Sequence, residues 1–265
     1  MTVTGALAKS PGKVGCATIY FHGQPGSADE LALFERAAPS GWFAPDRSPG
    51  ISRLAYTAYF DGIADQIRAY SFDQPVKLVG FSIGAYVALE VAARLSDLEL
   101  SIDLVSPAAP LSTGPYLETM AGKMVFVLAR GHPRLFKAVS MVQGIIARIF
   151  PGKLCDLLFA SAQGGDATLY SDPLFRGKMQ RLVQRGLGHN NAAYRHEIAG
   201  YVGDWAPVLR NVDQPVTIWQ GQRDNWSPPA MAENLAALLP CVVTVHRLGG
   251  CSHYSTLREY LRSSA

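Results

Sequence analysis

The sequence predicts an α/β fold: a mostly parallel β-sheet flanked by helices, with a helical segment inserted between two of the strands. Three observations lead to this prediction. Short β-branched and apolar runs alternate with helical patterns toward both ends of the 265-residue chain, as in a parallel sheet whose strands are joined by helices. Between them, residues 111–207 show helical periodicity only. One predicted strand runs through residues 80–84, GFSIG, directly into a helix, which is the context of a nucleophile elbow.

The composition indicates a chain with a sizeable hydrophobic core. Hydrophobic residues make up 48% of the sequence and charged residues 17%, which argues against a disordered protein. The formal net charge is only +3, so we expect no nucleic-acid partner. The chain begins without the long apolar segment of a secretory signal, and no stretch approaches the roughly 20 apolar residues of a membrane span. We therefore expect no integral membrane segment and a cytoplasmic location.

The four cysteines are Cys16, Cys155, Cys241 and Cys251. They show neither a C-x-x-C pair nor the spacing of metal ligands. We interpret them as free thiols of a reducing compartment, with a bridged pair as the alternative.

The first predicted strand leads into a loop that is a candidate part of the functional site. Residues 16–21 form a short apolar run that ends in HGQPG at residues 22–26. Ser27 and Glu30 then have the S-x-x-E spacing of a capping box, which predicts a helix to about residue 38. Because ligands bind at the carboxyl ends of the strands in open α/β sheets, we expect this loop to face the ligand.

The other predicted core elements follow in alternation along the chain. Two prolines start the helix after the fifth strand pattern, where proline is favoured in the first turn. Strands are predicted at residues 42–45, 76–79, 102–105, 215–220 and 242–248, and helices at 56–70, at 85–93, from 228 to 239 and from about 256 onward.

The helical insertion is interpreted as a cap, residues 111–207, on a core formed by residues 1–110 and 208–265. Residues 111–210 carry twelve Lys and Arg against six Asp and Glu. This excess fits either attraction of anionic substrates or surfaces, or an ordinary solvated exterior.

The clearest cap helix is predicted from Arg134 to Phe150. Its six periodic Leu, Val and Ile side chains are expected to face inward, with Arg134, Lys137 and Arg148 outside. Met141 and Phe150 are candidates for the roof of a substrate pocket.

Three candidate catalytic residues follow the ends of three different predicted strands: Ser82, Asp224 and His253. A serine hydroxyl is a poor nucleophile at neutral pH, so it needs a base within hydrogen-bond reach. The base in turn needs a carboxylate that fixes its tautomer and stabilises the imidazolium. Asp213 is the rival carboxylate, but it precedes its strand instead of following it.

Over essentially its whole length the chain resembles the α/β-hydrolase-fold serine hydrolases that carry a helical cap. The segments that carry the resemblance are HGQPG at 22–26, GFSIG at 80–84, GQRD at 221–224 and GGCSH at 249–253. In one respect the chain departs from the family: only about twenty residues precede residue 22, which is short for the two leading strands that members usually have.

The resemblance implies a role for each matching residue. Ser82 would be the nucleophile, His253 the general base and then acid, and Asp224 the orienting carboxylate. The oxyanion hole would be formed by the backbone N–H groups of Gln24 and Ile83. One such donor contributes about 3 kcal/mol of transition-state stabilisation.

The predicted function is hydrolysis of a carboxylic ester of a small, largely apolar substrate through an acyl-enzyme, without cofactor or metal. Phe81 and Trp226 are the expected substrate contacts. A serine at the elbow argues against the dehalogenases and epoxide hydrolases of the superfamily, which have aspartate there. Proline iminopeptidases share an HG-x-PG loop, but their nucleophile surroundings differ from GFSIG, and the cap offers only Glu118 and Glu197 to hold a substrate amine.

Several alternatives stay open within and beyond the enzymes. The same residues would serve a lactonase, a thioesterase, a carbon–carbon bond hydrolase or a cofactor-free haloperoxidase. A ligand-binding receptor with little turnover is the alternative from another class. The sequence gives no indication of the oligomeric state.

Overall fold

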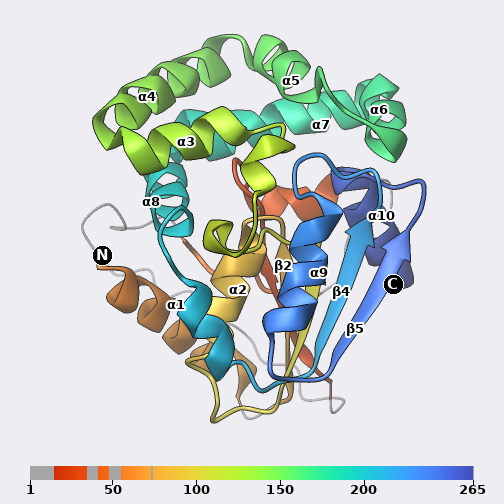
Figure 1. The fold of residues 1–265 in the computed structure, drawn as a ribbon. Helices are drawn as coiled ribbons and strands as arrows, with labels where there is room; N and C mark the ends of the chain where they lie inside the picture. The colour runs from red at the N-terminus through yellow and green to blue at the C-terminus, as the bar shows by residue number, and fades with distance from the viewer. Residues whose placement is uncertain (1–14, 35–40, 48–54, 73, 265) are drawn as a thin grey trace, which may run out of the picture.

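A computed structural model describes residues 15–34, 41–47, 55–72 and 74–264 of the chain. Its centre is a five-stranded, wholly parallel sheet in which the strands lie side by side in chain order (Figure 1). The α/β class and the parallel sheet predicted from the sequence are therefore confirmed. The strands are β1 Ala17–Phe21, β2 Val76–Phe81, β3 Leu100–Val105, β4 Val216–Gly221 and β5 Val243–Leu248.

Helices cover both faces of the sheet. The three helices that connect successive strands lie on one face of the sheet, because the connections between parallel strands are right-handed. Figure 1 shows α9 (Pro229–Leu238) in front of β4 and β5, whereas α10 (His253–Ser263) lies behind the sheet and packs on β3 and β4. The core helices are α1 Tyr56–Ser71, α2 Gly84–Ala92, α9 Pro229–Leu238 and α10 His253–Ser263.

The elbow lies at the most buried place in this fold. All nine residues of α2 are buried, because the helix is enclosed by the sheet, by α1 and by the segment that precedes β4. Strands β2 and β3 are covered on both faces, and all their residues are buried except Lys77 and Ser101, which are half-buried. β5 is the edge strand, and it alternates between half-buried and exposed side chains.

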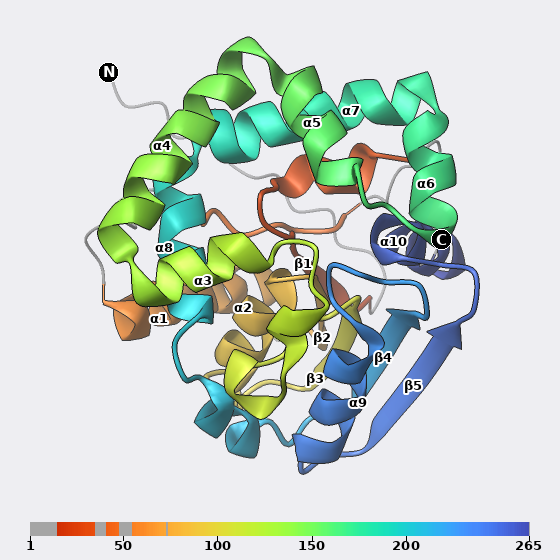
Figure 2. The ribbon, with the colours of Figure 1, turned by 45° about the horizontal axis from the view of Figure 1, so that its top comes forward.

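All the regular structure between β3 and β4, every residue of which is described, is helical. These helices arch over the carboxyl ends of the strands (Figures 1 and 2). They are the short helices η3 Leu111–Thr113, η4 Tyr116–Glu118, η5 Gln184–His189 and η6 Ala206–Asn211, and the α-helices α3 Lys123–Gly131, α4 Pro133–Ile149, α5 Pro151–Phe159, α6 Gly164–Ser171, α7 Pro173–Val183 and α8 Asn191–Tyr201.

No single helix in the described ranges is long and apolar enough to cross a membrane. Helices α4 and α5 together meet the length and composition of a span, but the chain bends by 116° at the break between them.

The strand predicted at residues 42–45 is reduced to one bridge. Phe43 exchanges two backbone hydrogen bonds with β1, from its N–H to the Thr18 carbonyl and from the Tyr20 N–H to its own carbonyl. Pro45, which has no N–H to donate, follows two residues later.

The capping box predicted at Ser27 does not form. The Ser27 hydroxyl accepts a bond from the Asp29 N–H (3.3 Å), but the Glu30 side chain turns into the core instead of toward Ser27. The helix is a short 3-10 segment, η1 Ala28–Ala32, and the part predicted at residues 35–38 lies outside the described residues.

Helix α4 has the predicted bounds to within a residue, but its predicted orientation is wrong. The side that faces the protein carries Phe136, Ser140, Gly144 and Ala147. Small residues let the helix approach its neighbours closely: a Cβ added at Gly144 would lie 3.0 Å from the Leu187 carbonyl of η5. The large apolar side chains consequently point away from the protein.

Candidate active site

The elbow that presents Ser82 is held in shape by the two glycines around it. Ser82 follows β2 and has φ +56°, in the left-handed region that costs a non-glycine residue energy. A Cβ on Gly80 would lie 2.7 Å from the Ala85 Cα, and one on Gly84 would lie 2.0 Å from the Phe21 carbonyl oxygen. Both positions therefore require glycine, and the turn packs directly against the end of β1.

A histidine–carboxylate pair forms beside the elbow. His253 Nδ1 and Asp224 Oδ2 are 2.8 Å apart, and both side chains are almost fully buried. The other oxygen, Asp224 Oδ1, accepts the N–H groups of Trp226 and Ser227, both at 2.9 Å. Asp213 precedes β4 and is exposed, so it lies at the opposite end of that strand from this pair.

Charge around His253 sets its basicity. Burial lowers the pKa of the ring, but the carboxylates of Asp224, Asp166 and Glu30 raise it, and the net shift is upward. Because Nδ1 faces Asp224, we assign the proton to Nδ1, which leaves Nε2 as the basic nitrogen.

The ring of His253 is held between two aromatic side chains. Its centroid lies 4.7 Å from that of Phe81 and 6.0 Å from that of Trp226, which stacks on it at 23°. Within the described residues Ser82 Oγ makes no hydrogen bond to this ring. In unliganded enzymes this bond is often long and tightens when substrate binds.

Two backbone amides remain available next to Ser82. Gln24 and Ile83 line the same cavity as Ser82. Neither amide donates to an acceptor within the described chain. The loop that carries Gln24 lies against the elbow, because a Cβ on Gly23 would be only 3.1 Å from the Ser82 Cβ. If Ser82 attacks a carbonyl carbon, these two N–H groups can therefore donate to the carbonyl oxygen.

The cavity above Ser82 has a volume of about 380 Å³ and a mainly apolar lining. Trp226 contributes to this lining, as predicted, whereas Phe81 is fully buried beneath His253 and does not line it. The predicted roof residues Met141 and Phe150 are exposed and lie outside it. The lining residues from within residues 111–207 are Met120, Ala121, Gly122, Met124, Val125, Phe126, Gln143, Leu154, Leu157, Leu158, Ser161, Leu187, Tyr194 and Ile198.

The sequence matches the model of one protein family, described as lipid-droplet associated hydrolase, over residues 60–254. This match covers most of the chain and includes the elbow, the aspartate and the histidine. The chain belongs to the lipid-droplet associated hydrolase family. It is thus a member of the α/β-hydrolase superfamily, and the resemblance inferred from the sequence is confirmed.

Curated relatives of this hydrolase include two bacterial enzymes. A 2-(acetamidomethylene)succinate hydrolase of Mesorhizobium japonicum is 26% identical over 74% of the chain. A pimeloyl-[acyl-carrier protein] methyl ester esterase of Neisseria meningitidis is 29% identical over 71%. The chain spans 63% and 64% of the length of these relatives.

Solved structures share the fold of this hydrolase at low identity. An esterase from Exiguobacterium antarcticum has a TM-score of 0.58 and 15% identity, over 94% of this chain and 92% of the esterase. A putative non-heme bromoperoxidase from Mycobacterium tuberculosis has a TM-score of 0.65 and 14% identity, over 94% and 89%.

Glu30 has a role in this hydrolase that the sequence analysis missed. It is fully buried, and its Oε2 accepts the Gly23 N–H and the Tyr20 hydroxyl, both at 2.9 Å. Burial raises the pKa of Glu30 to about 7. The S-x-x-E spacing includes Glu30, but it predicted a helix cap. In the structure the Glu30 side chain instead supports the loop that carries Gln24.

Glu197 from α8 is buried within the protein and is not available to bind a substrate amine. It accepts hydrogen bonds from the Gln24 side chain (2.6 Å) and from the Tyr59 hydroxyl, and Arg47 lies 3.4 Å away. Glu118, the other candidate, is exposed. These contacts fix the side chain of Gln24 and thereby the loop whose amide faces Ser82.

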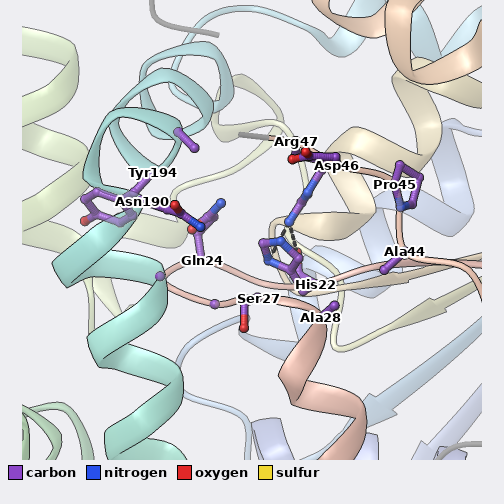
Figure 3. A pocket seen from close by; sticks show the side chains of 13 residues that line it. His22, Gln24, Ser27, Ala28, Ala44, Pro45, Asp46, Arg47, Asn190 and Tyr194 are labelled. Carbon is purple, nitrogen blue, oxygen red and sulfur yellow. Dashed lines mark hydrogen bonds between the residues drawn. The ribbon is translucent and has the colours of Figure 1, made fainter. Parts of the chain in front are cut away.

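A second cavity, of about 280 Å³, lies on the other side of the Gln24 loop (Figure 3). Arg47 reaches toward His22 in this cavity and donates to the His22 carbonyl (2.8 Å). Ser82, Asp224 and His253 are absent from its lining. His22 is therefore part of the loop's support.

Asp166 from α6 was also missed, and it connects this helix to the segment that carries His253. It is fully buried and accepts the N–H groups of Tyr254 (3.0 Å) and Ser255 (2.7 Å), at the N-terminus of α10. Beside it, the Gly165 N–H donates to the Gly250 carbonyl (2.9 Å). The position of His253, the first residue of α10, is therefore coupled to the position of α6.

Within the described ranges, no group of three or more His, Cys, Asp or Glu side chains could hold a metal ion. All four cysteines are described and free, as predicted.

Proposed function

We propose that this hydrolase cleaves carboxylic esters with an apolar acyl group, with Ser82 as the nucleophile. One observation carries the proposal: a strained serine and two residues with unpaired amides line a single apolar cavity, and a buried histidine–aspartate pair lies next to it. The aspartate of that pair accepts the N–H groups of Trp226 and Ser227, which also line the cavity. Each part supplies what the others lack, since serine needs a base, the base needs a carboxylate and the oxyanion needs donors.

The proposed reaction proceeds in two halves. His253 Nε2 takes the proton from Ser82 Oγ as the oxygen attacks the ester carbon, and the resulting oxyanion accepts the N–H groups of Gln24 and Ile83. His253 then gives the proton to the leaving alcohol, and an acyl-enzyme remains. Water repeats the attack with its proton going to the same nitrogen, so that Ser82 is restored and the carboxylic acid is released.

The composition of the cavity supports the substrate class. Its lining is mainly aliphatic, aromatic and methionine side chains, which favour an apolar group over a charged one. The family description refers to lipid droplets and one relative is named as a methyl ester esterase, and both descriptions fit an apolar acyl ester. Residues 111–207 would then form the cap that encloses the acyl group above a core of residues 1–110 and 208–265.

Turnover of nitrophenyl esters of graded acyl length tests this proposal. We expect hydrolysis by the wild type, with a preference for a chain length above acetate. Ser82→Ala should retain less than about one-thousandth of the rate, because binding and oxyanion effects alone give little more. A Ser82→Ala protein that keeps a larger share of the rate would exclude Ser82 as the nucleophile. A wild type that hydrolyses no ester would exclude the ester as the substrate.

A further inference from the structure

The outer face of α4 is apolar although no part of the described chain covers it. Its side chains on this face are between 37% and 61% exposed. At 3.6 residues per turn they lie on the side of the helix opposite the one that packs on the protein. A helix on the surface of a globular protein ordinarily turns its apolar side chains toward the core and its polar side chains toward solvent. We call this surface the apolar cap face; it consists of Leu135, Met141, Val142, Ile145, Ile146, Ile149 and Phe150.

The charged residues of α3 and of α4, the helix that carries the apolar cap face, have a single sign. Residues 119–155, which include all of α3 and α4, contain no Asp or Glu and six Lys or Arg, and all six cations are exposed. On α4, Arg134, Lys137 and Arg148 lie together on one flank, between the apolar cap face and the buried side. An apolar face with cations along its edge is typical of a helix that lies in a membrane interface, where anionic headgroups meet the cations.

The active-site cavity reaches the same outer surface. Two residues of its lining are mostly exposed: Met124 on α3 (60%) and Leu157 on α5 (72%). Both helices pack against α4, and Figure 2 shows the three together on the side away from the sheet. Gln143, which also lines the cavity, lies on the flank of α4 opposite the cations. An apolar ester could therefore pass from a lipid layer on this surface toward Ser82.

We propose that the apolar cap face docks on a phospholipid surface that carries anionic headgroups, with α4 lying along it. The main alternative, a second copy of the chain seated on the same face, would bring two acid-free cationic surfaces together and is disfavoured by their repulsion. Docking does not depend on which bond Ser82 attacks; only the delivery of substrate to Ser82 rests on the proposed function.

Cosedimentation of the full chain with vesicles tests the docking, and we use the Ser82→Ala background so that no turnover is needed. We expect binding to phosphatidylcholine vesicles that contain phosphatidylserine, and weaker binding as salt is raised. Ile145→Glu should weaken binding more than about tenfold, because it replaces an inserted apolar side chain by a charge. Arg134→Gln should weaken it roughly fivefold.

Val242→Glu is the matched control. Val242 is 77% exposed but precedes β5 at the far end of the sheet, so this variant should bind as the parent does. No binding of the parent to the mixed vesicles, or equal binding by the Ile145→Glu and Val242→Glu variants, would overturn the proposal. The proposal would also be overturned if the parent formed dimers without lipid, and the Ile145→Glu substitution abolished these dimers but left vesicle binding unchanged.

A second readout separates docking from catalysis. In the active protein, Ile145→Glu should hydrolyse a short water-soluble ester at the wild-type rate, since Ile145 does not line the cavity. The same variant should lose hydrolysis of an ester embedded in the mixed vesicles. Equal loss on both substrates would show a folding defect and contradict the docking role.

Discussion

Ser82 combines backbone strain with close packing, and both follow from a small number of neighbouring atoms. Its left-handed φ of +56° is maintained by contacts that leave no room for a Cβ at Gly80 or Gly84. Strain of this kind costs on the order of 1–3 kcal/mol and persists only where the surroundings over-determine it. Here the end of β1 and the start of α2 impose it, and the result is a hydroxyl directed into the cavity.

The carboxylate partner of His253 can be tested by substitution. Asp224→Asn should reduce kcat by about 10⁴-fold, because the amide can hold the imidazole in the wrong tautomer. Asp213→Asn is the control at the other end of β4 and should leave kcat near the wild-type value. Steady-state kinetics on one nitrophenyl ester distinguish the two, and a larger loss in the Asp213 variant would contradict the assignment.

The pH dependence of the reaction tests the environment of His253. The base acts only when the ring is neutral, and the pKa of His253 is raised by Asp224, Asp166 and Glu30 against the effect of burial. The value of kcat/KM should therefore fall as pH decreases through a midpoint above the ordinary value of 6.5. NMR titration of the ring in the Ser82→Ala protein should give the same midpoint. A midpoint at or below 6.5 in both measurements would show that burial outweighs the carboxylates.

At the scale of elements, the parts that were predicted correctly are those with a strong local pattern. The five sheet strands, the helix that begins at Tyr56 and the elbow helix have bounds within about two residues of the prediction. In each, apolar spacing and flanking glycine or proline agree with the tertiary environment. The candidate residues after strand ends could be predicted for the same reason, since the carboxyl ends of parallel strands meet at one edge.

The parts that were not predicted depend on contacts between distant segments. Glu30 leaves its expected cap because buried donors from Tyr20 and Gly23 are available to it. Asp166 has no sequence motif that indicates its contact with α10, 88 residues further along the chain. The apolar side of α4 was assigned to the interior because amphipathic periodicity does not show which side faces the protein. Only the packing of Gly144 against η5 determines the orientation.

The cap helices should set the preference for acyl length. Leu158 on α5 lines the cavity, so Leu158→Ala enlarges it and should move the optimum toward longer acyl chains. Each methylene that a pocket holds is worth roughly 1–3 kcal/mol, so a shift is measurable. Met141→Ala is the control, since Met141 is exposed and outside the cavity; its chain-length profile and melting temperature should stay unchanged. Identical profiles for both variants and the wild type would mean that the acyl group binds elsewhere.

At the scale of the whole molecule, the helices between β3 and β4 are joined to the rest of the chain at the site itself. Glu197 from α8 bonds the side chain of Gln24, and Asp166 from α6 bonds the N-terminus of α10. The loop with the proposed oxyanion donor and the loop with His253 are thus each fixed by a helix from between β3 and β4. A movement of these helices would therefore move both loops.

The central claim is that Ser82 is the nucleophile of this hydrolase, and covalent labelling tests it most directly. A fluorophosphonate probe should label the wild type once, and mass spectrometry of the digested protein should place the label on the peptide that contains Ser82. Ser82→Ala should remain unlabelled, whereas Ser161→Ala, which alters a serine in the lining of the same cavity, should be labelled like the wild type. Labelling of the Ser82→Ala protein, or a label on any other residue of the wild type, would contradict the account.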